Sequence, residues 1–443
     1  MKIRRLPVDT GISGWNAILP APDAPDELSD HITADWLVIG GGFAGLAAVR
    51  RLSILHPDAR IVLLEAKRIG EGPAGRNTGF MIDLPHHLTS EGYGGQMERD
   101  RKDAAANRAA IDFTAQMATE FGLSKEAFDR PGKINAAASD HGHAHNLEYA
   151  QHLTNMNEPH EMLDAAQMHQ ITGTSYYQSG LVTPGAGLVQ PALFVRSMAK
   201  GLRSNRVSLY ENAPVIRLQR DRDWTAQTPN GSVTAPKVIL GVNGHANSFG
   251  HFRGRLMHIH LYGSMTRALT PDEIKTLGGD RRWGLTPADP MGSTVRRISG
   301  TGGDRIIVRN RFSYDPSMQI SEGKLARMAC DHDKGFAARF PMLKGVEMEY
   351  RWGGRLCLSR NGAPALGEVD EGLYSACCQN GLGVAKGTLH GMLMADLASG
   401  VGSDLLDQVL DQPLPSRLPP EPFATLGARA VLRWGEYKAG REI

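Results

Sequence analysis

The chain has 443 residues, 49 Lys and Arg against 47 Asp and Glu, a formal net charge of +2, and 41% hydrophobic residues. This length exceeds the roughly 250 to 300 residues at which a single core stops growing, so we expect two domains. The near-neutral charge, without a basic patch, argues against nucleic acid as a partner. The sequence has no apolar signal segment and no run of about 18 apolar residues, which predicts a cytoplasmic protein without a membrane span. The four cysteines show no CxxC spacing, so we expect no metal site and no disulfide framework.

The first part of the chain predicts an irregular arm followed by one βαβ unit. Residues 1–33 form the arm, because Pro20, Pro22 and Pro25 oppose a helix there. The fold is expected to begin with a strand at 36–39. A Gly-rich turn at 40–45, a helix at 46–55 and a strand at 60–64 complete the unit.

Further elements follow in chain order. Apolar positions at helical spacing predict a long surface helix over 96–121, and residues 130–185 show short strands. A helix over 190–202 precedes strands at 207–210 and 237–241, which we expect to join the first sheet. The β-like pattern over 254–312 and a helix over 321–340 predict a second domain. The chain then returns to the first domain with a strand at 373–378, a Gly turn and a helix over 388–398.

A glycine motif directly follows the first predicted strand. The segment from Val38 to Gly45 reads VIGGGFAG and contains GxGxxG between the strand and the helix. Gly40 permits the tight turn, Gly42 lets the backbone approach a pyrophosphate, and Gly45 allows close packing of the helix. Glu65 ends the second strand, where a carboxylate accepts hydrogen bonds from ribose hydroxyls. The alternative is a Gly-rich turn of an unrelated α/β protein, and the motif alone fits FAD and NAD equally.

The next segment separates these two cofactors. Residues 68–79 read RIGEGPAGRNTG. The segment resembles the R-I-G-x-G-A-S-G-R-N-G-G signature of the FAD-dependent D-amino-acid-oxidase superfamily, closest to gamma-glutamylputrescine oxidase-like enzymes. The resemblance implies FAD, with this loop running past the flavin ring and ribityl chain. Pro73, Ala74 and Thr78 replace the family's Ala, Ser and Gly, which removes a hydroxyl next to the cofactor.

Four later segments are similar to the same superfamily. They are residues 185–196, residues 238–244, the RWGGR segment at 351–355 with 361–367, and the loop QNGLGV at 379–384. The motif and the resemblance together assign the following residues to FAD: Gly40, Gly42, Phe43, Ala44, Gly45, Glu65, Ala66, Arg68, Gly75, Arg76, Asn77, Thr78, Gly79, Val215, Asn243, Gly244, Asn380, Gly381, Leu382, Gly383 and Val384.

These observations predict an α/β fold with an α+β second domain. A Rossmann-like FAD-binding domain is combined with an antiparallel-sheet substrate domain, and the chain crosses between them. We assign residues 34–90, 181–245 and 346–443 to the FAD-binding domain and residues 91–180 and 246–345 to the substrate domain.

In such flavoenzymes the cofactor carries the chemistry, so no catalytic side chain is assigned. Residues that follow the flavin loop or face it from the second domain are expected to line the substrate pocket: His86, His87, Tyr93, His258, His260, Tyr262, Arg309, Arg311, Tyr314 and Arg355. For each His the alternative is a surface or core imidazole. Arg309 and Arg311 alternate along a strand and are expected to share one face. One of them would bind a substrate anion, and the alternative is a solvent-facing basic edge.

Two further positions bear on the substrate and the flavin. Leu356 stands where the W-x-G-L-R-P segment of amino-acid oxidases has its carboxylate-binding Arg, and Arg355 is shifted by one residue to the opposite strand face. This favours an amine without an α-carboxylate. Cys357 lies near the flavin-bonded cysteine of sarcosine-oxidase-like relatives, and a buried inert thiol is the alternative.

The leading hypothesis is oxidation of the C–N bond of a small primary or secondary amine. The imine formed would be hydrolysed to an aldehyde, and the electrons would pass to oxygen. The alternative is an FAD-dependent amino-acid dehydrogenase or oxidase that uses a non-oxygen acceptor, such as a quinone or a partner protein. Modification of a tRNA base and a flavin-bearing subunit without its own activity are further alternatives. The identity of the amine and the oligomeric state stay open.

Overall fold

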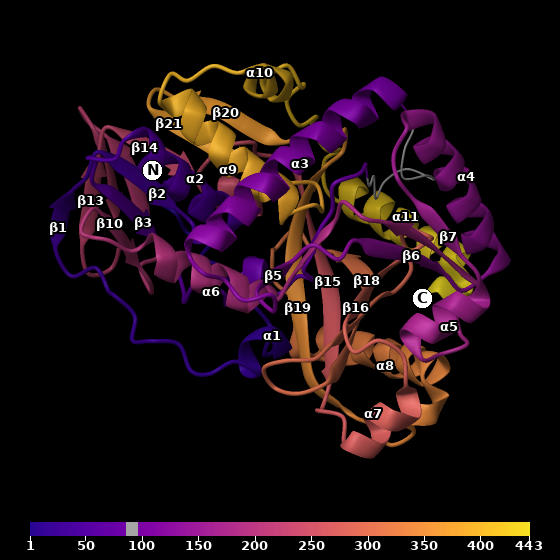
Figure 1. The fold of residues 1–443 in the computed structure, drawn as a ribbon. Helices are drawn as coiled ribbons and strands as arrows, with labels where there is room; N and C mark the ends of the chain where they lie inside the picture. The colour runs from indigo at the N-terminus through magenta and orange to yellow at the C-terminus, as the bar shows by residue number, and fades with distance from the viewer. Residues whose placement is uncertain (86–95) are drawn as a thin grey trace.

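The computed structural model describes residues 1–85 and 96–443. His86, His87 and Tyr93 therefore lie outside the described residues. The described residues form four sheets. Figure 1 shows a six-stranded sheet with its helices at the upper left and an eight-stranded sheet extending from the centre. The predicted α/β class, with a dinucleotide-type sheet joined to a second sheet, is confirmed.

The six-stranded sheet contains the five strands predicted for the first domain, and these five run parallel to one another. Every residue of the strands β2 and β3 is buried, as expected for a sheet that is covered on both faces. In spatial order the strands are β10 (Val207–Tyr210), β3 (Ile61–Leu64), β2 (Trp36–Ile39), β14 (Lys237–Leu240), β21 (Leu373–Cys377) and the antiparallel edge strand β20 (Ala365–Asp370).

Five helices pack into one core cluster with this sheet: α2 (Phe43–Leu55), α3 (Met97–Glu120), α6 (Pro191–Leu202), α9 (Ala385–Ala398) and the short α10 (Asp404–Leu410). The long helix α3 was expected to belong to the substrate domain. It instead buries Ala110, Ile111 and Met117 in the core of the six-stranded sheet, because its small residues allow close approach to α9.

A four-stranded sheet, which the sequence did not predict, packs on the other face of the six-stranded sheet through a second core cluster. Its strands are β1 (His31–Thr33), β13 (Ser232–Ala235), β12 (Trp224–Gln227) and β11 (Arg217–Arg220). The N-terminal arm is therefore only partly irregular. It contains β1 and the single helical turn α1 (Gly14–Ala17).

The eight-stranded sheet is largely antiparallel, with one parallel pair between β16 and β6. In spatial order its strands are β19 (Met348–Ser359), β15 (Leu256–Thr266), β18 (Arg305–Tyr314), β17 (Thr294–Ile298), β16 (Trp283–Pro287), β6 (Lys133–Ala137), β8 (Ser179–Thr183) and β7 (Glu161–Leu163). Strand β19 was expected in the FAD-binding domain. It instead pairs with β15 along its whole length, as an edge strand of the second sheet.

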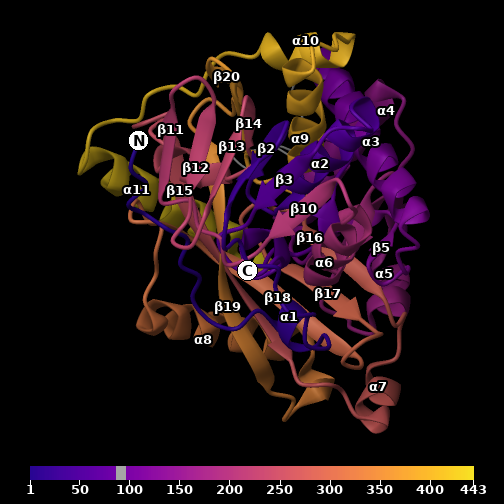
Figure 2. The ribbon, with the colours of Figure 1, turned by 90° about the vertical axis from the view of Figure 1, so that its left-hand side faces the viewer.

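Helices surround this second sheet, and short elements connect the two parts. The helices are α4 (Asp140–Met156), α5 (Ala165–Thr172), α7 (Pro271–Leu277), α8 (Glu322–Arg339) and α11 (Phe423–Ala439). The short elements are a three-stranded sheet of β4 (Phe80–Met81), β9 (Gly187–Val189) and β5 (Phe128–Asp129), the helix α10 (Asp404–Leu410), and the turns η1 (Pro73–Gly75), η2 (Asn243–Asn247), η3 (Pro341–Leu343) and η4 (Gly440–Glu442). Figure 2 shows the chain passing between the two large sheets.

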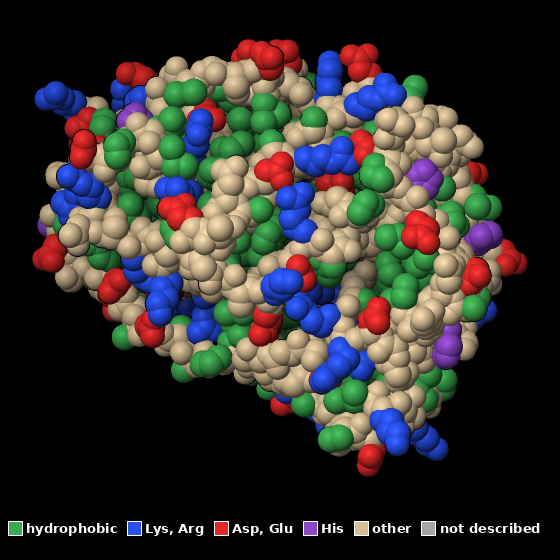
Figure 3. All heavy atoms as spheres, viewed as in Figure 1, with side chains coloured by type: hydrophobic (Ala, Val, Ile, Leu, Met, Phe, Trp, Pro, Cys, Tyr) green, Lys and Arg blue, Asp and Glu red, His purple; other side chains and the backbone are tan. Residues whose placement is uncertain are grey.

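Charged side chains of both signs are interspersed on the face shown in Figure 3. Within residues 1–85 and 96–443, no helix is both long and apolar enough to cross a bilayer. The same residues contain no group of three or more His, Cys, Asp or Glu side chains that could hold a metal ion. The four cysteines are free thiols, and Cys357, Cys377 and Cys378 are buried.

Candidate functional site

A cavity of about 310 Å³ is lined by residues from both large sheets. On one side it receives the carboxyl ends of β2, β3 and β14 and the loop after β21. On the other side it receives residues of β15, β18 and β19. Ligands of parallel α/β sheets bind outside the carboxyl ends of the strands, so this is the place where a dinucleotide is expected.

The glycine motif has the geometry that its spacing predicts. Gly40 has a φ of +107°, a conformation that favours glycine. A Cβ on Gly45 would lie 1.8 Å from the carbonyl oxygen of Gly40, so only glycine lets α2 pack this closely on β2. Gly42 is the N-cap of α2 and lines the cavity. The bare amides and the positive end of the helix dipole therefore face a space that fits a pyrophosphate.

Glu65 stands at the end of β3 with both carboxylate oxygens held by backbone amides. Its Oε2 accepts from the Gly41 amide at 2.7 Å and its Oε1 from the Lys67 amide at 3.1 Å. Burial raises the pKa of Glu65, while the hydrogen bonds from Gly41 and Lys67 partly offset this rise. The remaining lone pairs of a fixed carboxylate at this position fit the ribose hydroxyls of an adenosine.

The loop that resembles the flavin signature is fixed by its own side chains. Asn77 accepts from the Gly79 amide at 2.7 Å and donates to the Ala74 carbonyl at 2.7 Å. A Cβ on Gly75 would lie 1.8 Å from the Gly70 carbonyl oxygen, so this turn requires glycine. The loop is therefore a preformed wall of the cavity.

Arg76 ties this loop to two distant parts of the chain. Its guanidinium donates to the carbonyls of Glu71 at 2.6 Å, Thr10 at 3.1 Å, Gly11 at 3.0 Å and Gly353 at 3.1 Å. These four carbonyls satisfy most of the N–H donors of Arg76. The main role of Arg76 is therefore structural, because it joins the loop to the N-terminal arm and to β19.

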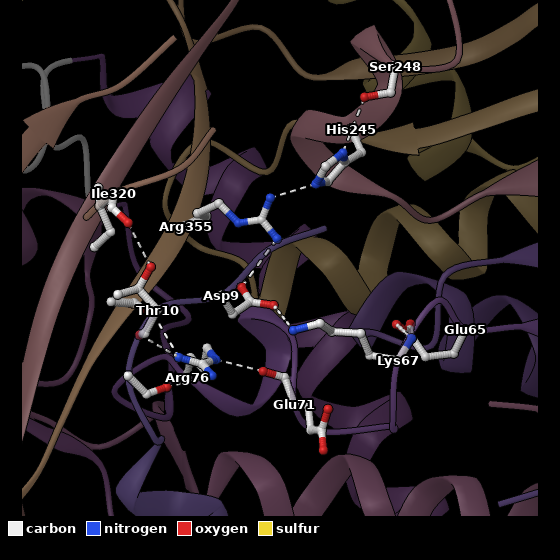
Figure 4. Close-up of polar contacts among 12 residues, drawn as sticks. Asp9, Thr10, Glu65, Lys67, Glu71, Arg76, His245, Ser248, Ile320 and Arg355 are labelled. Carbon is white, nitrogen blue, oxygen red and sulfur yellow. Dashed lines mark hydrogen bonds and ion pairs between the residues drawn. The ribbon is translucent and has the colours of Figure 1, made fainter. Parts of the chain in front are cut away.

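The N-terminal arm completes the cavity. Residues 3 and 5–7 of this arm line it, and behind them Asp9 is buried between two cationic side chains (Figure 4). Its carboxylate lies 3.2 Å from Arg355 Nη2 and 3.3 Å from Lys67 Nζ. Burial alone would raise the pKa of Asp9, but Arg355, Arg76 and Lys67 outweigh it and hold the pKa below its ordinary value. Asp9 is therefore a carboxylate at neutral pH.

Two histidines in the cavity wall are neutral at pH 7. Burial, followed by the charge of Arg355, lowers the pKa of His245 to about 3 and that of His258 to about 4. His245 Nε2 lies 2.6 Å from Arg355 Nη1, so the neutral ring accepts a hydrogen bond from the guanidinium (Figure 4). Arg355 is thus engaged on one side by Asp9 and on the other by His245.

The structure brings most of the residues assigned to FAD to this cavity. The following line it: Gly40, Gly42, Phe43, Ala44, Glu65, Ala66, Arg68, Arg76, Asn77, Thr78, Val215, Asn243, Gly244, Gly381, Leu382, Gly383 and Val384. Gly45, Gly75 and Gly79 are not among the described lining residues. They support it, because a Cβ at each would collide with backbone.

Asn380 also supports the cavity from behind. It has a φ of +49°, accepts from the Ser359 amide at 2.8 Å and donates to the Gly362 carbonyl at 2.9 Å. These bonds attach the last glycine loop to the end of β19 and to the turn that follows it, so the role of Asn380 is to position the loop.

Of the residues expected in the substrate pocket, His258, Tyr262, Arg309 and Arg355 line the cavity. His260 and Tyr314 are not among the described lining residues. The ring of His260 lies 3.3 Å from Asp315, and Tyr314 donates to Glu421 at 3.3 Å.

Arg309 and Arg311 do not share a face, which corrects the expectation from their alternation. The pairing of β15 with β18 shifts register opposite Arg311, and Arg311 has a φ of +59°. This bulge sends Arg311 away from the cavity to Asp331 at 2.9 Å and Glu436 at 3.0 Å. Arg309 remains at the cavity.

Cys357 is buried and lines the cavity. A hydrogen bond with Cys378, together with burial, raises the pKa of the Cys357 thiol. The thiol is therefore protonated at neutral pH and is a poor nucleophile. The choice between an inert thiol and a flavin link remains a prediction.

The sequence did not indicate several lining residues: Ile3, Arg5, Leu6, Pro7, Lys67, His245, Thr286, Thr294 and Gln379. Two of them had a local signal. His245 directly follows the Asn-Gly turn at 243–244, and Gln379 begins the last glycine loop. The arm residues had none, because only the tertiary fold brings them to the cavity.

Comparisons with known proteins agree with this geometry. The family model described as FAD dependent oxidoreductase (DAO) matches residues 35–397. The chain is similar to the gamma-glutamylputrescine oxidoreductase of Escherichia coli (strain K12), with 26% identity over 91% of this chain and 93% of that protein. It is also similar to the sarcosine oxidase subunit beta of Rhodobacter capsulatus, with 21% identity over 82% of this chain and 83% of that protein.

Solved structures share the fold. The crystal structure of glycine oxidase from Geobacillus kaustophilus has a TM-score of 0.69 and 18% identity, and the match covers 88% of this chain and 100% of that chain. The L-proline dehydrogenase from P. horikoshii has a TM-score of 0.63 and 16% identity, with 86% and 97% covered. The glycine cradle, Glu65 and the flavin loop fit FAD, and the family model spans most of the chain. The chain therefore belongs to the DAO family of FAD dependent oxidoreductases, an enzyme family whose cofactor is FAD.

Proposed function

We propose that the enzyme oxidises the C–N bond of a small primary or secondary amine that carries no α-carboxylate. The product is an imine, which water hydrolyses to an aldehyde, and the electrons pass to oxygen. FAD, when bound, supplies the chemistry by accepting a hydride from the substrate carbon. The names of the similar gamma-glutamylputrescine oxidoreductase and sarcosine oxidase subunit support an amine as the substrate class.

The engagement of Arg355 carries this proposal. An α-carboxylate is held best by an Arg whose paired N–H donors are available. Here one terminal nitrogen of Arg355 donates to Asp9 and the other to His245. A substrate carboxylate at this point would also meet the buried charge of Asp9. The cavity therefore disfavours an α-amino acid beside Arg355.

The charge of the wall supports a neutral amine as the reacting form. Among the described lining residues, Glu65 is the one acid, against six basic residues: Arg5, Lys67, Arg68, Arg76, Arg309 and Arg355. This excess complements the diphosphate of FAD. It also disfavours an ammonium cation, so an amine loses its proton more readily in the cavity than in water. The lone pair that expels a hydride is available only in this neutral form.

Arg309 favours a second candidate function, an FAD-dependent amino-acid dehydrogenase or oxidase with a non-oxygen acceptor. It lines the cavity from β18 of the eight-stranded sheet, whereas the glycine motif lines it from the six-stranded sheet. There it would hold an anionic group of the substrate, separated from Arg355 on β19 by the strand β15. In that case the carboxylate would be bound by Arg309.

The test is anaerobic reduction of the bound flavin. The purified holoenzyme is mixed with primary amines, secondary amines and α-amino acids while the oxidised flavin band near ~450 nm is recorded. Bleaching by amines, followed by peroxide release on re-aeration, supports the proposal. Bleaching by α-amino acids alone overturns it, and an Arg309→Leu variant that then loses this reduction supports the second function. Bleaching by an amine without peroxide on re-aeration assigns a different electron acceptor.

A further inference from the structure

The C-terminal helix α11 carries an exposed apolar stripe. Its outward side chains Phe423, Leu426, Val431, Trp434 and Tyr437 are each between 61% and 78% exposed. They make up five of the 14 large hydrophobic side chains exposed in the described part of the chain. Single exposed apolar residues are ordinary, but this share in one helix of 17 residues marks an interaction surface.

The stripe follows the helical repeat. Phe423, Leu426, Trp434 and Tyr437, together with the exposed Ala430, recur at intervals of three and four, which places them along one side of the helix, and Val431 lies at the border of this side. The rings of Trp434 and Tyr437 stack with their centroids 5.9 Å apart. Figure 2 shows α11 along one side of the molecule.

The inner face of α11 is fixed by packing and by charge. Ala428 and Leu432 pack against the cluster of Ile259, Phe312 and Tyr314. Glu436 accepts from Arg311 at 3.0 Å and from the Phe312 amide at 3.2 Å. The helix cannot roll its stripe inward without breaking these contacts.

The end of the chain is anchored as well. Glu442 is buried and accepts from the Ala138 amide at 2.8 Å. Arg339 donates to the Glu442 carbonyl at 3.0 Å. The apolar stripe is thus a fixed part of the surface and not a frayed terminus.

Basic residues accompany the stripe, and acidic ones do not. Arg429, Arg433 and Lys438 are exposed on α11. Glu436 is the one acid of the helix and it points inward. A helix with Trp, Phe and Leu on one face and Lys or Arg beside it is typical of a helix that lies in the plane of a bilayer interface.

We propose that α11 docks the protein peripherally on an anionic lipid surface. The stripe enters the boundary between headgroups and acyl chains, and the flanking cations bind anionic headgroups. Trp434 and Tyr437 have the amphipathic rings that prefer this depth. The docking does not depend on the proposed amine substrate, because it uses none of the residues that line the flavin cavity.

Charge favours a lipid surface over a second copy of the chain. A two-fold contact through the same stripe would bring Arg429 and Arg433 of both copies into one interface. Like charges at an interface oppose association, whereas anionic headgroups neutralise them. The partner surface that fits this face is therefore apolar at its centre and negatively charged at its edges.

The experiment measures binding of the holoenzyme to vesicles by co-sedimentation. Vesicles of phosphatidylcholine are compared with vesicles that also contain phosphatidylglycerol, at low and high salt. We expect binding to the anionic vesicles, weakened by salt. The triple variant Phe423→Ala, Trp434→Ala, Tyr437→Ala should lose binding. The double variant Arg429→Gln, Arg433→Gln should reduce the partition constant about 30-fold.

A matched control replaces exposed apolar residues on other helices, Met97→Ala on α3 and Leu147→Ala on α4, and should bind as the wild type does. Flavin content and melting temperature verify that each variant is folded, and the double variant touches no buried contact. Absence of wild-type binding to anionic vesicles at low salt overturns the proposal. So does a triple variant that binds normally, or a wild-type dimer that the triple variant converts to a monomer without any vesicle binding.

Discussion

Asp9 links the N-terminal arm to the flavin cavity, and its replacement by Asn tests this link. The carboxylate is 1% exposed and lies 3.2 Å from Arg355 and 3.3 Å from Lys67, whose side chains are 10% and 31% exposed. Asp9→Asn keeps the size of the side chain and removes its charge. The positive charges of Arg355 and Lys67, which Asp9 now neutralises, would then repel each other.

The magnitude follows from the burial of the pair. Removing one partner of a buried ion pair costs about 3 to 5 kcal/mol, and the partial exposure of Lys67 places this case near about 3 kcal/mol. With an unfolding entropy of about 2.1 cal/mol/K per residue, 443 residues give about 0.9 kcal/mol/K. We expect the melting temperature to fall by about 3 °C if the chain unfolds as one unit.

The pH dependence of this difference is also defined. The pKa of Asp9 lies below its ordinary value of 3.8. The stabilisation is therefore complete above pH 3.8 and is lost as the pH falls through the lower, folded-state pKa. The difference between the wild type and Asp9→Asn should stay constant from about pH 5 to pH 8.

The assay is thermal unfolding followed by circular dichroism, with saturating FAD for both proteins. Asp58→Asn is the matched control, since the Asp58 side chain is 94% exposed and its pairing with Arg206 at 3.4 Å should contribute little. A variant with normal flavin content and a melting temperature within about 1 °C of the wild type would falsify the argument from the buried pair.

Three further predictions concern the site. Gly45→Ala places a Cβ 1.8 Å from a backbone carbonyl oxygen and should abolish tight FAD binding, whereas Gly427→Ala, where an added Cβ meets nothing, should bind FAD normally in a flavin titration. The pKa of His258 is about 4, so its neutral form stabilises the fold above pH 6.5 and this stability is lost as the pH falls towards 4. Between pH 7 and pH 5 the free energy of unfolding should therefore fall by about 2 kcal/mol less in His258→Gln than in the wild type, as measured by melting experiments. Arg309→Leu should alter anaerobic flavin reduction with little change in melting temperature. Arg311→Leu should lower the melting temperature and leave flavin reduction unchanged, because Arg311 pairs with Asp331 and Glu436. Equal effects of the two substitutions would contradict their assignment to different faces of β18.

Local patterns identified the cofactor half of the protein. The apolar runs at 36–39 and 61–64, the glycine motif and Glu65 are adjacent in the chain, and their spacing alone defines a βαβ unit. The same holds for the strand, glycine loop and helix that end at Ala398. Each of these patterns involves only residues that are close together in the chain, so it can be recognised from the sequence alone.

The tertiary structure decided the residues that join distant segments. Asp9, His245 and Arg355 are separated by more than a hundred residues in the chain and meet only because the arm, η2 and β19 converge. The bulge at Arg311 depends on the register of β15 against β18, which no local pattern encodes. The outward direction of α11 depends on Glu436 reaching Arg311. Local periodicity therefore determined the elements and the cofactor, whereas long-range pairing determined the shape and charge of the pocket and the exposed face of the last helix.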